Sequence, residues 1–233
     1  MKKVIILVLW FLSTPTYSNS ITRGEDLSAL DVIIVYDNSG SMIGNTGIIE
    51  NHINDNFYAI LETYYDVHVI LISNDSVSSL GICIPAPLGS GSCPSDEKLP
   101  KYKHVVQTVN SREALQLVIS THDLWDQSLR AGSQRVIIAI TDGNSNIGVD
   151  TFMDDLVALD NEFSDFQFHA FATPPADGCT NNPSMDSVYK QLAEISGGLF
   201  HSIDNQTPET GWINSALNIP FAIFKSKFEC LGY

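Results

Sequence analysis

The stretch 31–42 reads DVIIVYDNSGSM, and it decides the fold class of this chain. Its first half, Val32–Tyr36, is a short run rich in β-branched residues, which is typical of a strand buried on both faces. Its second half places three polar side chains in a turn directly after that strand: Asp37, Ser39 and Ser41. Gly40 allows the turn to fold back, so these alternating side chains can converge on one point.

Similar strands alternate with helical patterns along the rest of the chain. We expect strands at 32–36, 67–72, 135–140, 166–171 and 199–203. Apolar residues recur at helical spacing at 49–64, 110–132, 150–163, 185–198 and 212–228. This alternation predicts a doubly wound α/β fold with a mostly parallel central sheet and helices on both faces. Ligands of such sheets bind beyond the carboxyl ends of the strands.

A second carboxylate follows the strand predicted at 135–140, where the chain continues Thr141-Asp142-Gly143. The two turns together supply two carboxylates and several hydroxyl groups at strand ends. Such an all-oxygen set suits Mg²⁺, Mn²⁺ or Ca²⁺ and does not suit Zn²⁺ or copper. We therefore predict a divalent cation, Mg²⁺ foremost, bound beyond the sheet.

The segment 31–42 closely resembles the opening of von Willebrand factor type A (VWA) domains. Their metal-ion-dependent adhesion site (MIDAS) is written D-x-S-x-S, then a Thr or Ser, then an Asp. The segment 138–143 is similar to the later Asp element of that family. The resemblance extends over about residues 30–225, and it implies the VWA fold.

The resemblance also implies a role for each ligand. Ser39 and Ser41 would bind the metal through their hydroxyls, and Asp37 and Asp142 would hold it directly or through water. Matching the apolar positions of the helix that begins near residue 111 implies Ser111 as the middle ligand. Thr108 is the alternative.

The implied function is protein binding without catalysis. An open coordination position on the metal would accept an Asp or Glu carboxylate of a partner protein. One alternative is a metal-dependent hydrolase that uses the same carboxylates to activate water, although no general base is evident beyond the metal ligands. Another is a structural surface or assembly protein whose metal only stabilises the fold. The D-x-S-x-S segment alone is also compatible with a simple Asx or ST turn.

Composition and the N-terminus indicate an exported single domain. The chain has 233 residues, of which 44% are hydrophobic, and a net charge of −15 that argues against nucleic acid as a partner. Two lysines, an apolar run at 4–12 and small polar residues at 13–20 form a secretory signal pattern. We expect cleavage after Ser18, an extension at 19–29, a VWA-like domain at 30–230, and a secreted or periplasmic location. An uncleaved N-terminal anchor is the alternative, and no later stretch is apolar enough to span a membrane.

The four cysteines fit an oxidising compartment. Cys83 and Cys93 lie ten residues apart within 74–104. This segment shows little of the regular apolar spacing of helices or strands, which predicts a loop insertion or an edge hairpin. Three connectivities are possible. The short loop favours Cys83–Cys93, which leaves Cys179–Cys230. A zinc site is the alternative, but the sequence has no C-x-x-C pair and no clustered histidines. The braced loop is expected either to determine specificity beside the metal or to cover an edge of the sheet.

Overall fold

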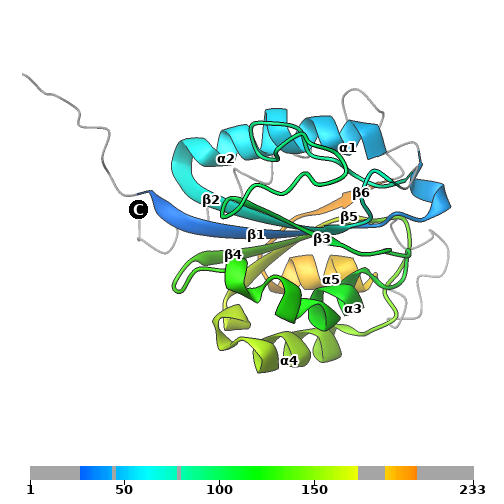
Figure 1. The fold of residues 1–233 in the computed structure, drawn as a ribbon. Coiled ribbons are helices and arrows are strands. Elements are labelled where there is room, and N and C mark those ends of the chain that lie inside the picture. Colours follow the sequence, from blue (N-terminus) through cyan, green and yellow to red (C-terminus); the bar gives the residue numbers. More distant parts are fainter. Residues whose placement is uncertain (1–26, 44–45, 78–79, 173–186, 204–233) are drawn as a thin grey trace, which may run out of the picture.

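The chain forms one six-stranded, all-parallel sheet with strand order β3-β2-β1-β4-β5-β6 (Figure 1). This computed structural model describes residues 27–43, 46–77, 80–172 and 187–203. The strands are β1 (Ser28–Tyr36), β2 (Tyr65–Ser73), β3 (Tyr102–Val106), β4 (Gln134–Thr141), β5 (Phe166–Ala172) and β6 (Phe200–Ser202). The predicted α/β class with a parallel sheet is confirmed.

Helices cover both faces of the sheet (Figure 1). On one face, α1 (Thr46–His52) continues through a helical segment, Ile53–Tyr58, into α2 (Ala59–Tyr64). On the other face lie α3 (Ala114–Ser120), α4 (Val149–Leu159) and α5 (Val188–Ile195). Successive strand side chains point to opposite faces, and β1 therefore supplies both layers. Val32 and Ile34 belong to the core under α1 and α2, and Ile33 and Val35 belong to the core under α3, α4 and α5.

The order of the strands reverses beside β1. The chain proceeds outward from β1 to β2 and β3, and then crosses over to β4 on the other side of β1. The backbone N–H of Asp37 donates to the carbonyl oxygen of Ile140 (2.9 Å), so the pairing of β1 with β4 continues to the carboxyl edge. The turns that follow β1 and β4 are consequently neighbours at the switch point, where α/β sheets bind their ligands.

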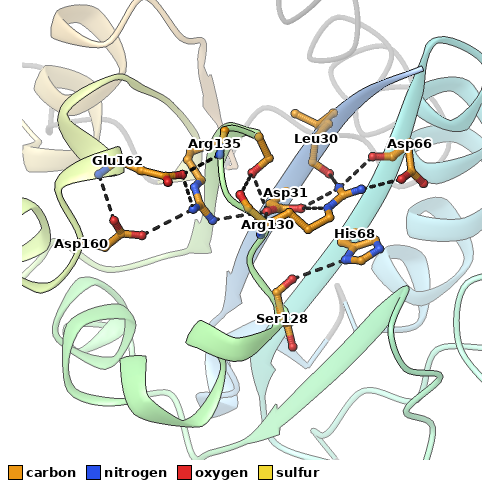
Figure 2. A network of polar contacts seen from close by, with 11 residues as sticks. Leu30, Asp31, Asp66, His68, Ser128, Arg130, Arg135, Asp160 and Glu162 are labelled. Atoms are coloured by element: carbon orange, nitrogen blue, oxygen red, sulfur yellow. Dashed lines mark hydrogen bonds and ion pairs between the residues drawn. The ribbon is translucent and has the colours of Figure 1, made fainter. Parts of the chain in front are cut away.

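The opposite, amino end of the sheet holds a buried ionic network (Figure 2). The Asp31 carboxylate is fully buried and accepts hydrogen bonds from Arg130 Nε (2.8 Å) and Ser133 Oγ (2.6 Å). It also pairs with Arg135 Nη1 at 3.3 Å, and Arg135 continues to Glu162 (2.8 Å). Two arginines therefore neutralise the Asp31 carboxylate, whose role is to hold this end of the fold together.

The segment between β2 and β3 covers one side of the molecule. The Cys83–Cys93 disulfide is present, as predicted. Ile82, Ile84 and Leu88 are fully buried in the core under α1 and α2. Of the two forms predicted for 74–104, the structure shows the loop insertion and not an edge hairpin, because the edge strand β3 pairs with β2 in parallel.

Two helix boundaries also differ from the prediction. The helix expected over 110–132 ends at Ser120 and is followed by two short 3-10 turns, His122–Leu124 and Asp126–Ser128. The helix expected over 150–163 ends at Leu159, and Phe163 lies in the 3-10 turn Asn161–Ser164.

Several predictions concern residues outside the described ranges. These are the signal segment 1–18, most of the extension at 19–29, Cys179, Cys230 and the helix expected over 212–228. Within the ranges that are described, none of the helices has the length and apolar character that a membrane crossing requires.

Candidate functional site

Three loops meet beyond the carboxyl ends of β1 and β4. The turn after β1 is tied to the β3–α3 loop by a hydrogen bond from Asn38 N to the Val109 carbonyl oxygen (2.8 Å). The turn after β4 is tied to the same loop by a bond from Asn146 N to the Arg112 carbonyl oxygen (2.9 Å). The β3–α3 loop is thus fixed between the two strand ends.

Three serine hydroxyls come together where these loops meet. Ser39 Oγ lies 3.1 Å from Ser41 Oγ and 2.9 Å from Ser111 Oγ. Ser39 and Ser111 are 72 residues apart in the sequence. The structure therefore brings together the three hydroxyl residues singled out by the sequence.

The Asp37 carboxylate lies fully buried beside this cluster. Its Oδ1 accepts from the backbone N–H of Ser39 (2.8 Å), and its Oδ2 accepts from Thr141 Oγ1 (2.7 Å). Thr141 Oγ1 also lies 3.0 Å from the Ser111 carbonyl oxygen and accepts from Gly143 N (3.1 Å). Thr141 therefore links the turn after β4 to both other loops. The sequence analysis did not assign it a role, although it directly precedes Asp142.

The charge of Asp37 has no cationic partner among the described residues. Both of its side-chain hydrogen bonds come from neutral groups, and no ion pair in the described ranges includes Asp37 or Asp142. A buried carboxylate is costly unless it is paired with a cation. Asp31, on the strand that precedes Asp37, has two arginines for this purpose. The donor set at Asp37 therefore fits a hard cation.

The carboxylates at this edge also act on two neighbouring tyrosines that are shifted mainly by burial. Burial raises the pKa of Tyr36 to about 12, and the charges of Asp37, Glu50 and Asp142 act in the same direction. Burial, together with the charge of Asp37, likewise raises the pKa of Tyr189 on α5. The field of the carboxylates at this edge thus favours positive charge.

The choice of middle ligand depends on the β3–α3 loop. Ser111 contacts Ser39, whereas Thr108 is exposed and makes no hydrogen bond in the described part of the chain. Gly143 lies so close to Ser111 that an added Cβ would come within 2.6 Å of the Ser111 Cβ. This close approach holds Ser111 against the turn after β4.

Asp142 lies at the same edge but is less tightly held. Its side chain is partly exposed and forms no hydrogen bond within the described residues. Its position follows from Thr141, whose hydroxyl contacts Asp37. An accessible carboxylate next to a buried one leaves room for contact with a cation or with water.

Asn38 is a residue of this site that the sequence analysis missed. It is nearly buried, its Nδ2 donates to the Leu80 carbonyl oxygen (2.7 Å), and its Oδ1 accepts from Asn74 N (2.6 Å). The first part of the insertion therefore lies against the D-x-S-x-S turn. Only its position between Asp37 and Ser39 could have indicated this, because its partners lie far along the sequence.

A second polar array was also missed. Asp96 Oδ1 lies 2.7 Å from His104 Nδ1, and His104 Nε2 lies 3.1 Å from Ser73 Oγ. Burial alone would raise the pKa of Asp96, but hydrogen bonds from His104 and from Ile84 N hold that pKa below its usual range. All three side chains are almost completely buried, so Ser73 is not presented to a substrate. The array fastens the insertion to β2 and β3.

In the described ranges, no group of three or more His, Cys, Asp or Glu side chains is arranged to hold a metal. A cation at this edge would therefore depend on the serine hydroxyls as much as on the two carboxylates.

No family model and no curated protein matches this chain.

Proposed function

We propose that this chain is an exported protein-binding domain of the VWA type. In this proposal a divalent cation, Mg²⁺ foremost, is held by five side chains of the carboxyl edge: Asp37, Ser39, Ser41, Ser111 and Asp142. The cation receives an Asp or Glu carboxylate from a partner protein. The observation that carries the proposal is a fully buried Asp37 carboxylate that lacks a described cationic partner and lies beside three serine hydroxyls, of which Ser39 contacts the other two.

The chemistry of the donors supports this reading. Carboxylate and hydroxyl oxygens are ligands that Mg²⁺, Mn²⁺ and Ca²⁺ accept. When bound, the cation would keep an open coordination position, because two carboxylates and three hydroxyls do not fill its octahedral shell, and this position can accept a further carboxylate. Thr141 and the Ser39 backbone N–H orient Asp37 for this purpose. Asn38 fixes the turn that carries Ser39 against the insertion.

Binding is favoured over turnover by the surroundings of the site. Hydrolysis needs a general base within hydrogen-bond reach of the attacking water. No histidine of the described residues forms a hydrogen bond with Asp37 or with the three serines; His104 is engaged by Asp96 and Ser73. The proposal therefore assigns no catalytic role to this edge.

Thermal melting of residues 19–233 with EDTA, Mg²⁺, Mn²⁺ or Ca²⁺ tests the proposal. A cation at 100 times its Kd adds about 2.7 kcal/mol of stability, which for a domain of this size raises Tm by roughly 5–10 °C. Asp142→Asn and Ser39→Ala are expected to lose most of this rise.

Asp155→Asn provides the matched control, because it makes the same charge change at an exposed position of α4. It should keep the rise seen in the parent protein. Equal rises in Asp142→Asn and Asp155→Asn would show that the cation binds elsewhere. No rise with any cation, together with no heat of binding in calorimetry, would overturn the metal site.

A further inference from the structure

Arg112 stands next to the serine cluster without a described partner of its own. It directly follows Ser111, its side chain is exposed, and its guanidinium group forms no hydrogen bond or ion pair in the described part of the chain. Its backbone is nevertheless fixed, because its carbonyl oxygen accepts from Asn146 N (2.9 Å). The site edge therefore carries one positive side chain on an anchored loop.

The other described cationic side chains are engaged elsewhere. Arg130 and Arg135 belong to the Asp31 network at the amino end of the sheet. The lysines all have partners: Lys98 with the Pro87 carbonyl oxygen, Lys101 with Asp66, Lys103 with Glu97 and Lys190 with Glu194. Arg112 thus differs from every other Lys and Arg in the described ranges.

The nearest carboxylate along the sequence does not neutralise Arg112. Glu113 Oε2 instead accepts from Asn110 Nδ2 (2.7 Å). The guanidinium group presents five donors in a fork that suits a carboxylate. Its charge also opposes the net charge of −15, which would otherwise repel an acidic partner.

We infer that Arg112 is a specificity-determining residue that pairs with a second acidic group of the partner. The inference rests on the function proposed above: the first carboxylate binds the cation, and the second reaches Arg112, one residue beyond the candidate ligand Ser111. In an extended peptide, residues i and i+2 lie on one side and about 6.6–6.8 Å apart. An extended acidic segment of the form Glu-x-Glu or Asp-x-Glu would present both of its carboxylates in this way, and it is the partner chemistry of this inference.

Two capped peptides test the inference on the mature chain loaded with Mn²⁺. One contains Glu-Gly-Glu between glycines and the other contains Glu-Gly-Gln. Water-proton relaxation of bound Mn²⁺ reports metal loading first, and then the displacement of water by each peptide. The wild-type protein should bind the two-acid peptide more tightly by up to about fivefold, the upper end of the range expected for one exposed charged pair.

Arg112→Gln should remove this preference, and Arg112→Glu should reverse it. Lys101→Gln is the control, because it removes one positive charge at the amino end of the sheet, beside Asp66. It should keep the preference, since a merely global charge effect would lower it equally in both variants.

The outcomes separate the inference from the proposed function. Mn²⁺ loading with equal affinity for both peptides in the wild-type protein would overturn the role of Arg112 and leave the metal site intact. An unchanged preference in Arg112→Gln would overturn it in the same way. Absence of Mn²⁺ loading would overturn the proposed function and this inference with it.

Discussion

At the scale of single residues, an aspartate on β1 and another directly after it serve two purposes. Asp31 and Asp37 are both fully buried. Asp31 is paired with Arg130 and Arg135, whereas Asp37 has only neutral hydrogen-bond donors among the described residues. A buried ion pair is strongly destabilised when one partner is removed, because the other charge is left uncompensated. Removing the charge of a buried carboxylate that has no cationic partner instead relieves the free-energy cost of burying that charge.

This contrast predicts different effects of the same substitution. Asp31→Asn should lower the free energy of unfolding by about 3 kcal/mol with or without a divalent cation, because Arg135 is left deeply buried with fewer negative partners. Asp37→Asn should cost less than about 1 kcal/mol in EDTA, because it removes a charge that is expensive to bury, but it should abolish stabilisation by Mg²⁺. Urea titrations of both variants with EDTA and with Mg²⁺ measure these differences. A large decrease in the free energy of unfolding of Asp37→Asn in EDTA would contradict the proposal that the Asp37 carboxylate has no cationic partner until a metal ion binds.

At the scale of elements, the insertion between β2 and β3 has two parts with different tasks. Asn54 binds the Pro85 carbonyl oxygen (2.6 Å) and the Leu88 N–H (3.0 Å), and so fastens the middle of the insertion to the helical layer. Asn38 fastens its first part to the D-x-S-x-S turn through Asn74 and Leu80. Most of the insertion therefore covers the core, and only its first residues border the candidate site.

Matched asparagine variants test this division. Asn38→Ala and Asn54→Ala each remove two hydrogen bonds between a buried asparagine and the backbone, so each should lower stability by about 1–3 kcal/mol. Only Asn38→Ala should also weaken Mn²⁺ binding, by severalfold, because it alone loosens the turn that carries Ser39. Calorimetric titration with Mn²⁺ at a temperature where both variants are folded compares them. Equal Mn²⁺ affinities would show that Asn38 has a purely structural role.

The elements also show where sequence patterns fail. The apolar spacing over 110–132 predicts a single helix, yet α3 ends at Ser120. Trp125 lies in the turns that follow and is still fully buried, with its Nε1 donating to Thr121 Oγ1 (3.2 Å). The 3-10 turns have a period close to that of an α-helix, so the pattern of buried residues continues after the helix has ended. β3 was missed because its buried His104 is satisfied by Asp96, which no local pattern reveals.

At the scale of the whole molecule, stability depends on pH through groups buried in the uncharged form. His169 on β5 is completely buried, and its Nδ1 accepts from Leu199 N (3.0 Å). Burial lowers its pKa to about 3, and burial likewise lowers the pKa of His201 on β6. In the unfolded chain a histidine titrates near about 6.5. The contribution of His169 is therefore fully present above about pH 6.5 and decreases as the pH falls toward 3.

The expected slope is measurable. Between these two pKa values His169 binds a proton in the unfolded state but not in the folded state. The free energy of unfolding should therefore fall by up to about 1.4 kcal/mol for each unit by which the pH decreases. Urea titrations at pH 7.5, 6.5, 5.5 and 4.5 should show this loss, and His169→Asn should make the slope shallower. His52→Asn, a partly exposed position on α1, is the control. A slope unchanged in His169→Asn would refute the assignment.

The class of fold and the oxygen-rich side chains at the strand ends can be predicted from the sequence. Buried-strand patterns that alternate with helical spacing require a parallel sheet covered on both faces, since every β1 side chain from Val32 to Tyr36 must be buried. The position of Asp37 and Asp142 after strands, and the short loop between Cys83 and Cys93, are local properties that can be read along the chain.

Contacts between residues that lie far apart in the sequence depend on the tertiary structure. Ser111 contacts Ser39 across 72 residues because the strand order reverses beside β1. The same topology places Asn38 against Leu80 and pairs Asp31 with Arg130. Such contacts depend on crossovers and strand order, which local periodicity does not encode. The charge balance of the site follows from them: only the folded chain shows that Asp31 is neutralised by arginines while Asp37 has no described cationic partner.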